Sequence, residues 1–149
     1  MENVKMNTVK DILNMKGMEV WSVTPHSKVF DALKLMADKN IGAVLVAENE
    51  NIVGILSERD YARKVALEGK SSRELQVQEI MSQRVLYITS DKNLDECMAL
   101  MIEKKIRHLP VFENEKLKGI ISIGDVVKAL LDHKKFTIEQ LEQYITSSR

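Results

Sequence analysis

The chain repeats one pattern of residues, and this duplication restricts its possible folds more than any other feature of the sequence. Sliding the sequence against itself by about 65 positions aligns apolar spacing, turns and single polar residues together, with roughly three in ten positions identical. Three pairs of aligned polar or glycine positions are Gly54 with Gly119, Ser57 with Ser122, and Asp60 with Asp125. We therefore expect two similar units built one after the other.

Each copy is predicted to follow the order β-α-β-β-α. In the first copy, strands are expected at 20–23, 43–47 and 52–56, because these runs are apolar or β-branched. Apolar residues at helical spacing over 29–36 predict the first helix, and a second helix is expected from Ser57. In the second copy, Asn93 followed by Glu96 has the pattern of a helix start. A single unit leaves one sheet face uncovered, so two units are expected to pack as a pseudo-two-fold pair of α+β class.

The boundaries follow from the same alignment. Residues 4–67 form repeat 1, residues 68–76 a polar linker, residues 77–131 repeat 2 and residues 132–149 a helical tail. The element at 9–13 recurs at 77–81 with a slightly longer offset.

The tail has no counterpart in the first copy. Thr137 with Gln140 has the pattern of a capping box, and Phe136 with Leu141 that of a hydrophobic staple. These signals predict a separate short helix that begins at Thr137. We expect it to pack on the rest of the chain or on a second chain.

Composition excludes several classes of function. Lysine and arginine number 22, as do aspartate and glutamate, so the chain has no general attraction for nucleic acid or anionic lipid. No apolar run reaches membrane-spanning length, and the first ten residues lack the apolar core of a signal peptide. The one cysteine, Cys97, falls on an apolar helix face and is expected in the core. We expect a cytoplasmic protein.

The segments 54–60 and 119–125 carry the strongest chemical signal. In each, a buried strand is expected to end at a serine, with an acid three residues further on. One interpretation is purely structural, because serine and acid can cap the new helix. The other is functional: the helix N-terminus attracts an anion, the acid can accept hydrogen bonds from a ribose diol, and the glycine lets the backbone approach a flat ligand.

Cations interrupt a second segment, 106–111. Arg107 and His108 precede an apolar strand there, and Arg107 offers a fork that suits phosphate. The first copy has Gly42 and Ala43 at these positions but carries Arg59 in its own loop. The three cations can converge on phosphate, or Arg107 can pair with a surface carboxylate.

These residues resemble a tandem pair of CBS domains, together called a Bateman module. The resemblance covers about 4–131 and rests on the two Gly-x-x-Ser-x-x-Asp segments with the Arg-His-Leu-Pro-Val run. It implies a disc-like dimer of modules, with adenosyl ligands in clefts between repeats. Such ligands are AMP, ADP, ATP, S-adenosylmethionine and sometimes NAD(H).

The resemblance also implies roles for single residues. The acids would hold ribose hydroxyls, the serines would contact ribose or phosphate, the threonines would line the sites, and the cations would meet phosphate. Backbone near 42–43 and 108–109 would contact the adenine edge. The implied set is Thr24, Gly42, Ala43, Ser57, Arg59, Asp60, Thr89, Arg107, His108, Pro110, Ser122 and Asp125. The second loop carries Ile123 and Gly124 in place of charged residues, so the two sites need not be equivalent.

The predicted function is regulatory binding of an adenine nucleotide, with energy or redox sensing passed to a partner protein by a homodimer of CBS pairs. No activated nucleophile, metal-ligand pattern or Gly-x-x-x-x-Gly-Lys loop indicates an enzyme. The alternative is a structural module that dimerises or docks on a partner, with a vestigial pocket. Nucleic-acid binding is not expected from the balanced charge.

Overall fold

The chain forms two compact units, and the element that leads each repeat packs in the unit of the other repeat. The computed structural model describes residues 7–17 and 19–147, so the predicted start of repeat 1 at residues 4–6 lies outside it. One unit combines residues up to 19 with residues from 87 onward, and the other spans residues 20–86. The helix that leads repeat 1 thus belongs with the sheet of repeat 2. The units therefore divide the chain at other points than the duplication does.

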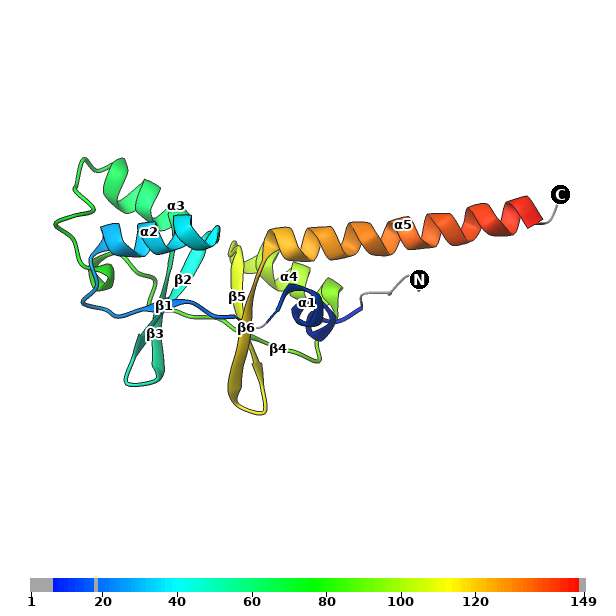
Figure 1. Cartoon of the computed structure of the whole chain (residues 1–149), viewed down its shortest axis with the longest axis horizontal. Helices are drawn as coiled ribbons and strands as arrows, with labels where there is room; N and C mark the ends of the chain where they lie inside the picture. The colour runs from blue at the N-terminus through cyan, green and yellow to red at the C-terminus, as the bar shows by residue number, and fades with distance from the viewer. Residues whose placement is uncertain (1–6, 18, 148–149) are drawn as a thin grey trace. The chain divides into compact units, whose positions relative to one another are not determined.

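The unit of residues 20–86 confirms the β-α-β-β-α order (Figure 1). Strand β1 runs parallel to β2, and β2 runs antiparallel to β3, in the order β1-β2-β3. Its elements are β1 (Ser22–Val23), α2 (Val29–Lys39), β2 (Ala43–Glu48), β3 (Asn51–Ser57), α3 (Glu58–Tyr61), the π-helical turn η1 (Ala62–Ala66) and the short 3-10 helix η2 (Val77–Glu79).

The core of this unit lies between its sheet and its helices. Apolar side chains from α2, β2 and β3 pack there with side chains from η1 and η2, and removing them from water drives the assembly. The buried cluster consists of Val29, Ala32, Met36, Val44, Val46, Leu56, Val65, Val77 and Ile80. Because η2 contributes to this cluster, the segment after the linker completes the unit of repeat 1.

The other unit repeats the same plan, including its irregularities. Its elements are α1 (Val9–Lys16), β4 (Ile88–Thr89), α4 (Leu94–Lys104), β5 (His108–Glu113), β6 (Lys116–Ser122) and α5 (Ile123–Ser147). Each hairpin shifts register at the same place, at Val46/Ala47 and at Val111/Phe112. Each hairpin turn has two residues of positive φ, at 49–50 and 114–115. A shared bulge and turn confirm that the duplication extends to backbone geometry.

The predicted start of α4 is confirmed, whereas the predicted start of the tail helix is wrong. Asn93 caps α4, since its side chain accepts a hydrogen bond from the N–H of Glu96 at 2.8 Å. Helix α5 instead runs unbroken through Thr137 for 25 residues. No glycine or proline follows Asp125 to interrupt it, so the helix passes through a capping pattern that requires extended backbone. The side chain of Phe136, in the predicted staple, lies outside the described residues.

The two aligned glycines let other parts of their own units approach the sheet. A Cβ added at Gly54 would lie 2.6 Å from Met81 Sδ and 3.0 Å from the carbonyl oxygen of Ser82. Ser82 pairs with Ile55 by two backbone hydrogen bonds of 2.9 and 3.0 Å. At Gly119 the added Cβ would lie 2.7 Å from Leu13 Cδ2. The glycines were expected to let a flat ligand approach the backbone. On the face where a Cβ would project, this space is filled by other parts of the same unit.

This difference predicts unequal costs for the same substitution. Gly54→Ala should lower the free energy of unfolding by about 1–3 kcal/mol, because the new methyl group meets backbone as well as a side chain. Gly119→Ala should cost less, because the terminal methyl of Leu13 can turn away. Urea unfolding of both variants measures the two changes. An equal or larger loss for Gly119→Ala would contradict this account.

Candidate functional site

Each predicted serine–acid pair forms a reciprocal cap at the start of a helix. Ser57 Oγ accepts a hydrogen bond from the N–H of Asp60 at 3.1 Å, and Asp60 Oδ2 accepts one from the N–H of Ser57 at 2.9 Å. The matching distances between Ser122 and Asp125 are 3.1 and 2.8 Å. The helix capping that was expected in both segments is therefore confirmed. In each case one carboxylate oxygen is committed to the backbone.

A third cap of this kind occurs where no ligand site was predicted. Asp11 Oδ2 accepts hydrogen bonds from the N–H groups of Asn7 and Thr8, and the N–H of Asp11 donates to Thr8 Oγ1 at 3.3 Å. The box at the start of α1 thus repeats the chemistry of the two candidate segments. Capping by itself does not mark a ligand site. Whether such an acid can also hold a ligand depends on what else it contacts.

Asp60 has a lysine one helical turn away. Lys64 Nζ lies 3.3 Å from Asp60 Oδ1, and it also donates a 2.9 Å hydrogen bond to the carbonyl oxygen of Ile80. The side chain of Asp60 is 21% exposed and that of Lys64 is 45% exposed. The i, i+4 spacing is a sequence signal by which this pair could have been found. The ammonium therefore joins the acid to the segment that completes the unit.

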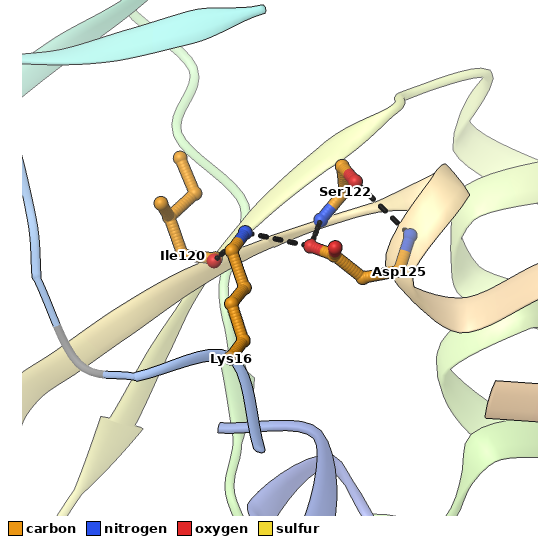
Figure 2. Close-up of polar contacts among 4 residues, drawn as sticks. All are labelled: Lys16, Ile120, Ser122 and Asp125. Atoms are coloured by element: carbon orange, nitrogen blue, oxygen red, sulfur yellow. Dashed lines mark hydrogen bonds and ion pairs between the residues drawn. The ribbon is translucent and has the colours of Figure 1, made fainter. Parts of the chain in front are cut away.

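Asp125 receives its cation from the other end of its unit in sequence. Figure 2 shows Lys16, at the end of α1, pointing toward Asp125. Lys16 Nζ lies 2.6 Å from Asp125 Oδ2 and donates a 2.9 Å hydrogen bond to the carbonyl oxygen of Ile120. Sequence reasoning missed Lys16, since 109 positions separate it from Asp125. Asp125 Oδ1 has no partner among the described residues.

Lys16 also perturbs the acid. Burial by itself would raise the pKa of Asp125, but the hydrogen bonds from Lys16 and the N–H of Ser122, with the positive charge of Lys16, outweigh it and hold the pKa below the ordinary value of 3.8. The carboxyl group is consequently ionised at neutral pH and remains able to accept hydrogen bonds.

The two halves satisfy one aligned carbonyl in different ways. The carbonyl oxygen of Ile55 accepts a hydrogen bond from the backbone N–H of Ser82, whereas that of Ile120 accepts one from the Lys16 ammonium. The second half therefore places a full positive charge where the first has a peptide dipole. Non-equivalence was expected from the loop residues Ile123 and Gly124; the structure adds a larger difference at Lys16.

Each unit brings some of its predicted residues together. In β2 and β3, Ala43 lies opposite Ser57, and the carbonyl oxygen of Gly42 accepts a 3.0 Å hydrogen bond from the N–H of Glu58. In β5 and β6, His108 lies opposite Ser122. The carbonyl oxygen of Arg107 likewise accepts a 2.8 Å bond from the N–H of Ile123. The backbone at 42–43 and at 107–108 therefore adjoins the serine–acid pair of its own unit.

The two threonines lie beside the C-terminal ends of β2 and β5, whereas the serine–acid pairs adjoin the N-terminal ends of these strands. Because β1 pairs with β2 at Val23–Val46, Thr24 continues toward Ala47, about 13 Å along the strand from Ala43. Thr24 bonds with Ser27, and Thr89 pairs with Phe112 in the register and donates to Asp91. Within its own unit, neither threonine joins the serine–acid pair.

A pocket of about 340 Å³ adjoins Thr89. It is lined by Tyr87, Ile88, Thr89, Lys92, Glu96 and Leu100. Neither Ser122 nor Asp125 is part of its lining. Thr89 therefore belongs to a different surface from the acid in its unit.

The predicted arginines form no ion pair within the described part of the chain. Arg107 is exposed and Arg59 is half-buried, and neither forms an ion pair with a described residue. The alternative, in which Arg107 pairs with a surface carboxylate, is thus not observed among the described residues. Pro110 is buried in β5 just before the pairing with β4 begins at Val111, and it lacks the N–H by which the aligned Leu45 donates a 3.3 Å hydrogen bond to the carbonyl oxygen of Trp21.

Cys97 is fully buried, as expected for a core residue. Burial raises the pKa of its thiol to about 11, so the thiolate is scarce at neutral pH. Within the described side chains, no group of three or more histidine, cysteine or acidic residues is arranged to hold a metal ion. None of the helices in the described ranges has the length and apolar character needed to cross a bilayer.

We predict that Lys16→Met raises the pKa of Asp125 and destabilises the fold by about 1 kcal/mol at neutral pH, since the pair is partly exposed. The folded-state pKa of Asp125 is lowered, so its contribution is present above about pH 4 and is lost as the pH falls through the folded value. Carboxyl NMR titration and urea unfolding between pH 2 and 7 measure both effects. A difference between wild type and variant that persists unchanged at pH 2 would contradict this assignment.

Comparison with known proteins connects this geometry to a family. The family model for the CBS domain matches residues 9–67 and 77–132. The mitochondrial CBS domain-containing protein CBSX3 of Arabidopsis thaliana is 34% identical over 148 residues, which cover 93% of this chain and 71% of that protein.

Solved structures agree with the match. A CBS-domain protein from Burkholderia ambifaria is 50% identical, with a TM-score of 0.79 over 83% of this chain and 93% of that one. The CBS-domain protein ATU1752 from Agrobacterium tumefaciens is 37% identical, with a TM-score of 0.80 over 87% of this chain and 97% of that one. The chain belongs to the CBS domain family and carries two of these domains in tandem.

Proposed function

We propose that the chain binds an adenosyl ligand as a regulatory signal and passes the signal to a partner protein without catalysing a reaction. The ligand class is AMP, ADP or ATP, with NAD(H) and S-adenosylmethionine as further candidates. The supporting observation is that Asp125, ionised and capped through Oδ2, keeps Oδ1 without a partner among the described residues. A carboxylate in this state can accept hydrogen bonds from a ribose diol.

Cations near each acid suit the anionic part of a nucleotide. Lys16 lies against Asp125, and Arg107 is exposed in the same unit. Lys64 and the half-buried Arg59 accompany Asp60 in the other unit. Arginine binds phosphate through a planar fork and lysine as a point charge. This supports a ligand with phosphate groups over an uncharged nucleoside.

Ligands reported for a protein of the same fold support the adenosyl class. The solved CBS domain pair of the protein MJ0100 is a complex with 5′-methylthioadenosine and S-adenosyl-L-methionine. It is 23% identical to this chain with a TM-score of 0.71, so the likeness concerns the fold. Action on a partner protein, a cytoplasmic location and assembly as a homodimer of CBS pairs belong to the proposal.

The test is a melting-temperature screen of the full chain against AMP, ADP, ATP, NAD, NADH and S-adenosylmethionine, followed by calorimetric titration of the ligand that binds. A ligand at one hundred times its dissociation constant should stabilise the fold by about 2.7 kcal/mol. Asp60→Ala and Asp125→Ala should weaken binding by about 1–3 kcal/mol at the site concerned.

Asp11→Ala is the matched control. It removes the same kind of helix cap from a place where no site is proposed, so it should lower stability and leave the dissociation constant unchanged. If neither Asp60→Ala nor Asp125→Ala affects binding more than Asp11→Ala does, the ribose assignment is wrong.

The second candidate is a dimerisation or docking module with a vestigial pocket. It is favoured by the finding that capping alone accounts for both serine–acid pairs, because the same box occurs at Thr8 and Asp11. This candidate would be favoured if none of the six ligands changed the melting temperature of the purified protein.

A further inference from the structure

Helix α5 carries an exposed apolar stripe along its length. Val127 is 42% exposed, Leu131 60%, Ile138 54% and Leu141 56%. In Figure 1 the second half of α5, drawn in orange to red, extends beyond the other elements of its unit. These large side chains therefore meet water in the single chain.

The stripe has the spacing of a helix that pairs with another helix. Steps of four, seven and three residues separate the four positions, and Lys134 completes the alternation of four and three. This is the period of the two apolar positions in a coiled-coil heptad. The stripe is about 21 Å long, from Val127 to Leu141.

The stripe is distinct from the face by which α5 packs on its own unit. Val126 and Ala129 are buried, at 0% and 2% exposure, and contribute to the core of that unit. Val127 and Leu131 point elsewhere, since one residue step turns a helix by about 100°. The helix thus has one face for its own unit and a second that no described residue covers.

The charges of α5 indicate the occupant. Residues 128–135 contain three lysines against one aspartate, whereas residues 137–147 contain two glutamates and no lysine or arginine. A second copy of α5 laid antiparallel places the basic half of each helix beside the acidic half of the other. A parallel arrangement would bring like charges together.

We propose that α5 pairs antiparallel with α5 of a second copy of this chain. The heptad then sets Leu131 against the partner's Leu141 and Lys134 against the partner's Ile138. Lys128 lies beside the partner's Glu142 at the edge of the contact. The stem of Lys134 covers apolar surface while its ammonium reaches water. This pairing does not depend on ligand binding.

Disulfide trapping in the full chain tests the geometry. Cys97→Ala removes the native thiol, and alanine is the residue at the aligned position, Ala32. In that background, Leu131→Cys and Leu141→Cys proteins are mixed and oxidised, one of them carrying an affinity tag that identifies the mixed dimer by mass. We expect the mixed disulfide to form several-fold faster than a Leu131→Cys disulfide with itself, because the axial offset of the latter pair is about 15 Å.

Gln140→Cys is the matched control, since Gln140 is exposed on α5 but lies off the stripe. Preferential crosslinking of Leu131→Cys to itself would mean a parallel pair and would overturn the proposal. A mixed disulfide that forms no faster than those of Gln140→Cys would overturn it as well.

Charge exchange provides a second measurement that leaves the apolar stripe intact. Lys128→Glu and Glu142→Lys should each weaken self-association by about two- to fivefold per ion pair. A mixture of the two variants should associate more tightly than either alone, because the mixed dimer restores opposite charges at both edges. Sedimentation at low salt measures this, and a mixture no tighter than the single variants would contradict the antiparallel register.

Discussion

A reciprocal hydrogen-bonded pair of serine and acid sets the point at which a strand becomes a helix in each half of the molecule. The serine hydroxyl accepts from the backbone of the acid, and the acid accepts from the backbone of the serine. These bonds satisfy helix N–H groups that would otherwise lack partners. They also hold the carboxylate at a fixed place at the end of the second hairpin strand. The backbone at which the first hairpin strand begins lies next to it.

The same interaction creates a possible binding group without requiring one. A capping carboxylate uses one oxygen for the backbone, and the other is available to a cation or a ligand. Asp60 and Asp125 each have an ammonium within ion-pair distance, whereas the capping Asp11 forms no ion pair with a described residue and feels the charge of the adjacent Lys10 at longer range. The difference between a structural and a functional acid therefore lies in its surroundings. Those surroundings differ between the halves, so duplication does not make the halves chemically equal.

The structural features that were predicted correctly from the sequence depend mostly on signals between residues close together in the chain. The β-α-β-β-α order of elements along the chain, the cap at Asn93 and the buried Cys97 depend on residues within a few positions of one another, and all were predicted. The start of the tail helix was predicted wrongly because the signal at Thr137 is local too, and nothing in the helix-forming residues around it makes the backbone extend. The placement of α1 beside the second sheet was not predicted, because a repeat shows which elements exist but not which copies pack together.

The sequence by itself determined the duplication, the α+β class and the residue types at the strand-to-helix transitions, because these follow from periodicity and hydrogen-bonding capacity along the chain. Only the tertiary structure decided that Lys16 is the cation of Asp125 and that Met81 and Leu13 occupy the space above the two glycines. The reason is physical: such contacts join residues far apart in sequence, and their partners are selected by which surfaces the packed core brings within a few ångströms.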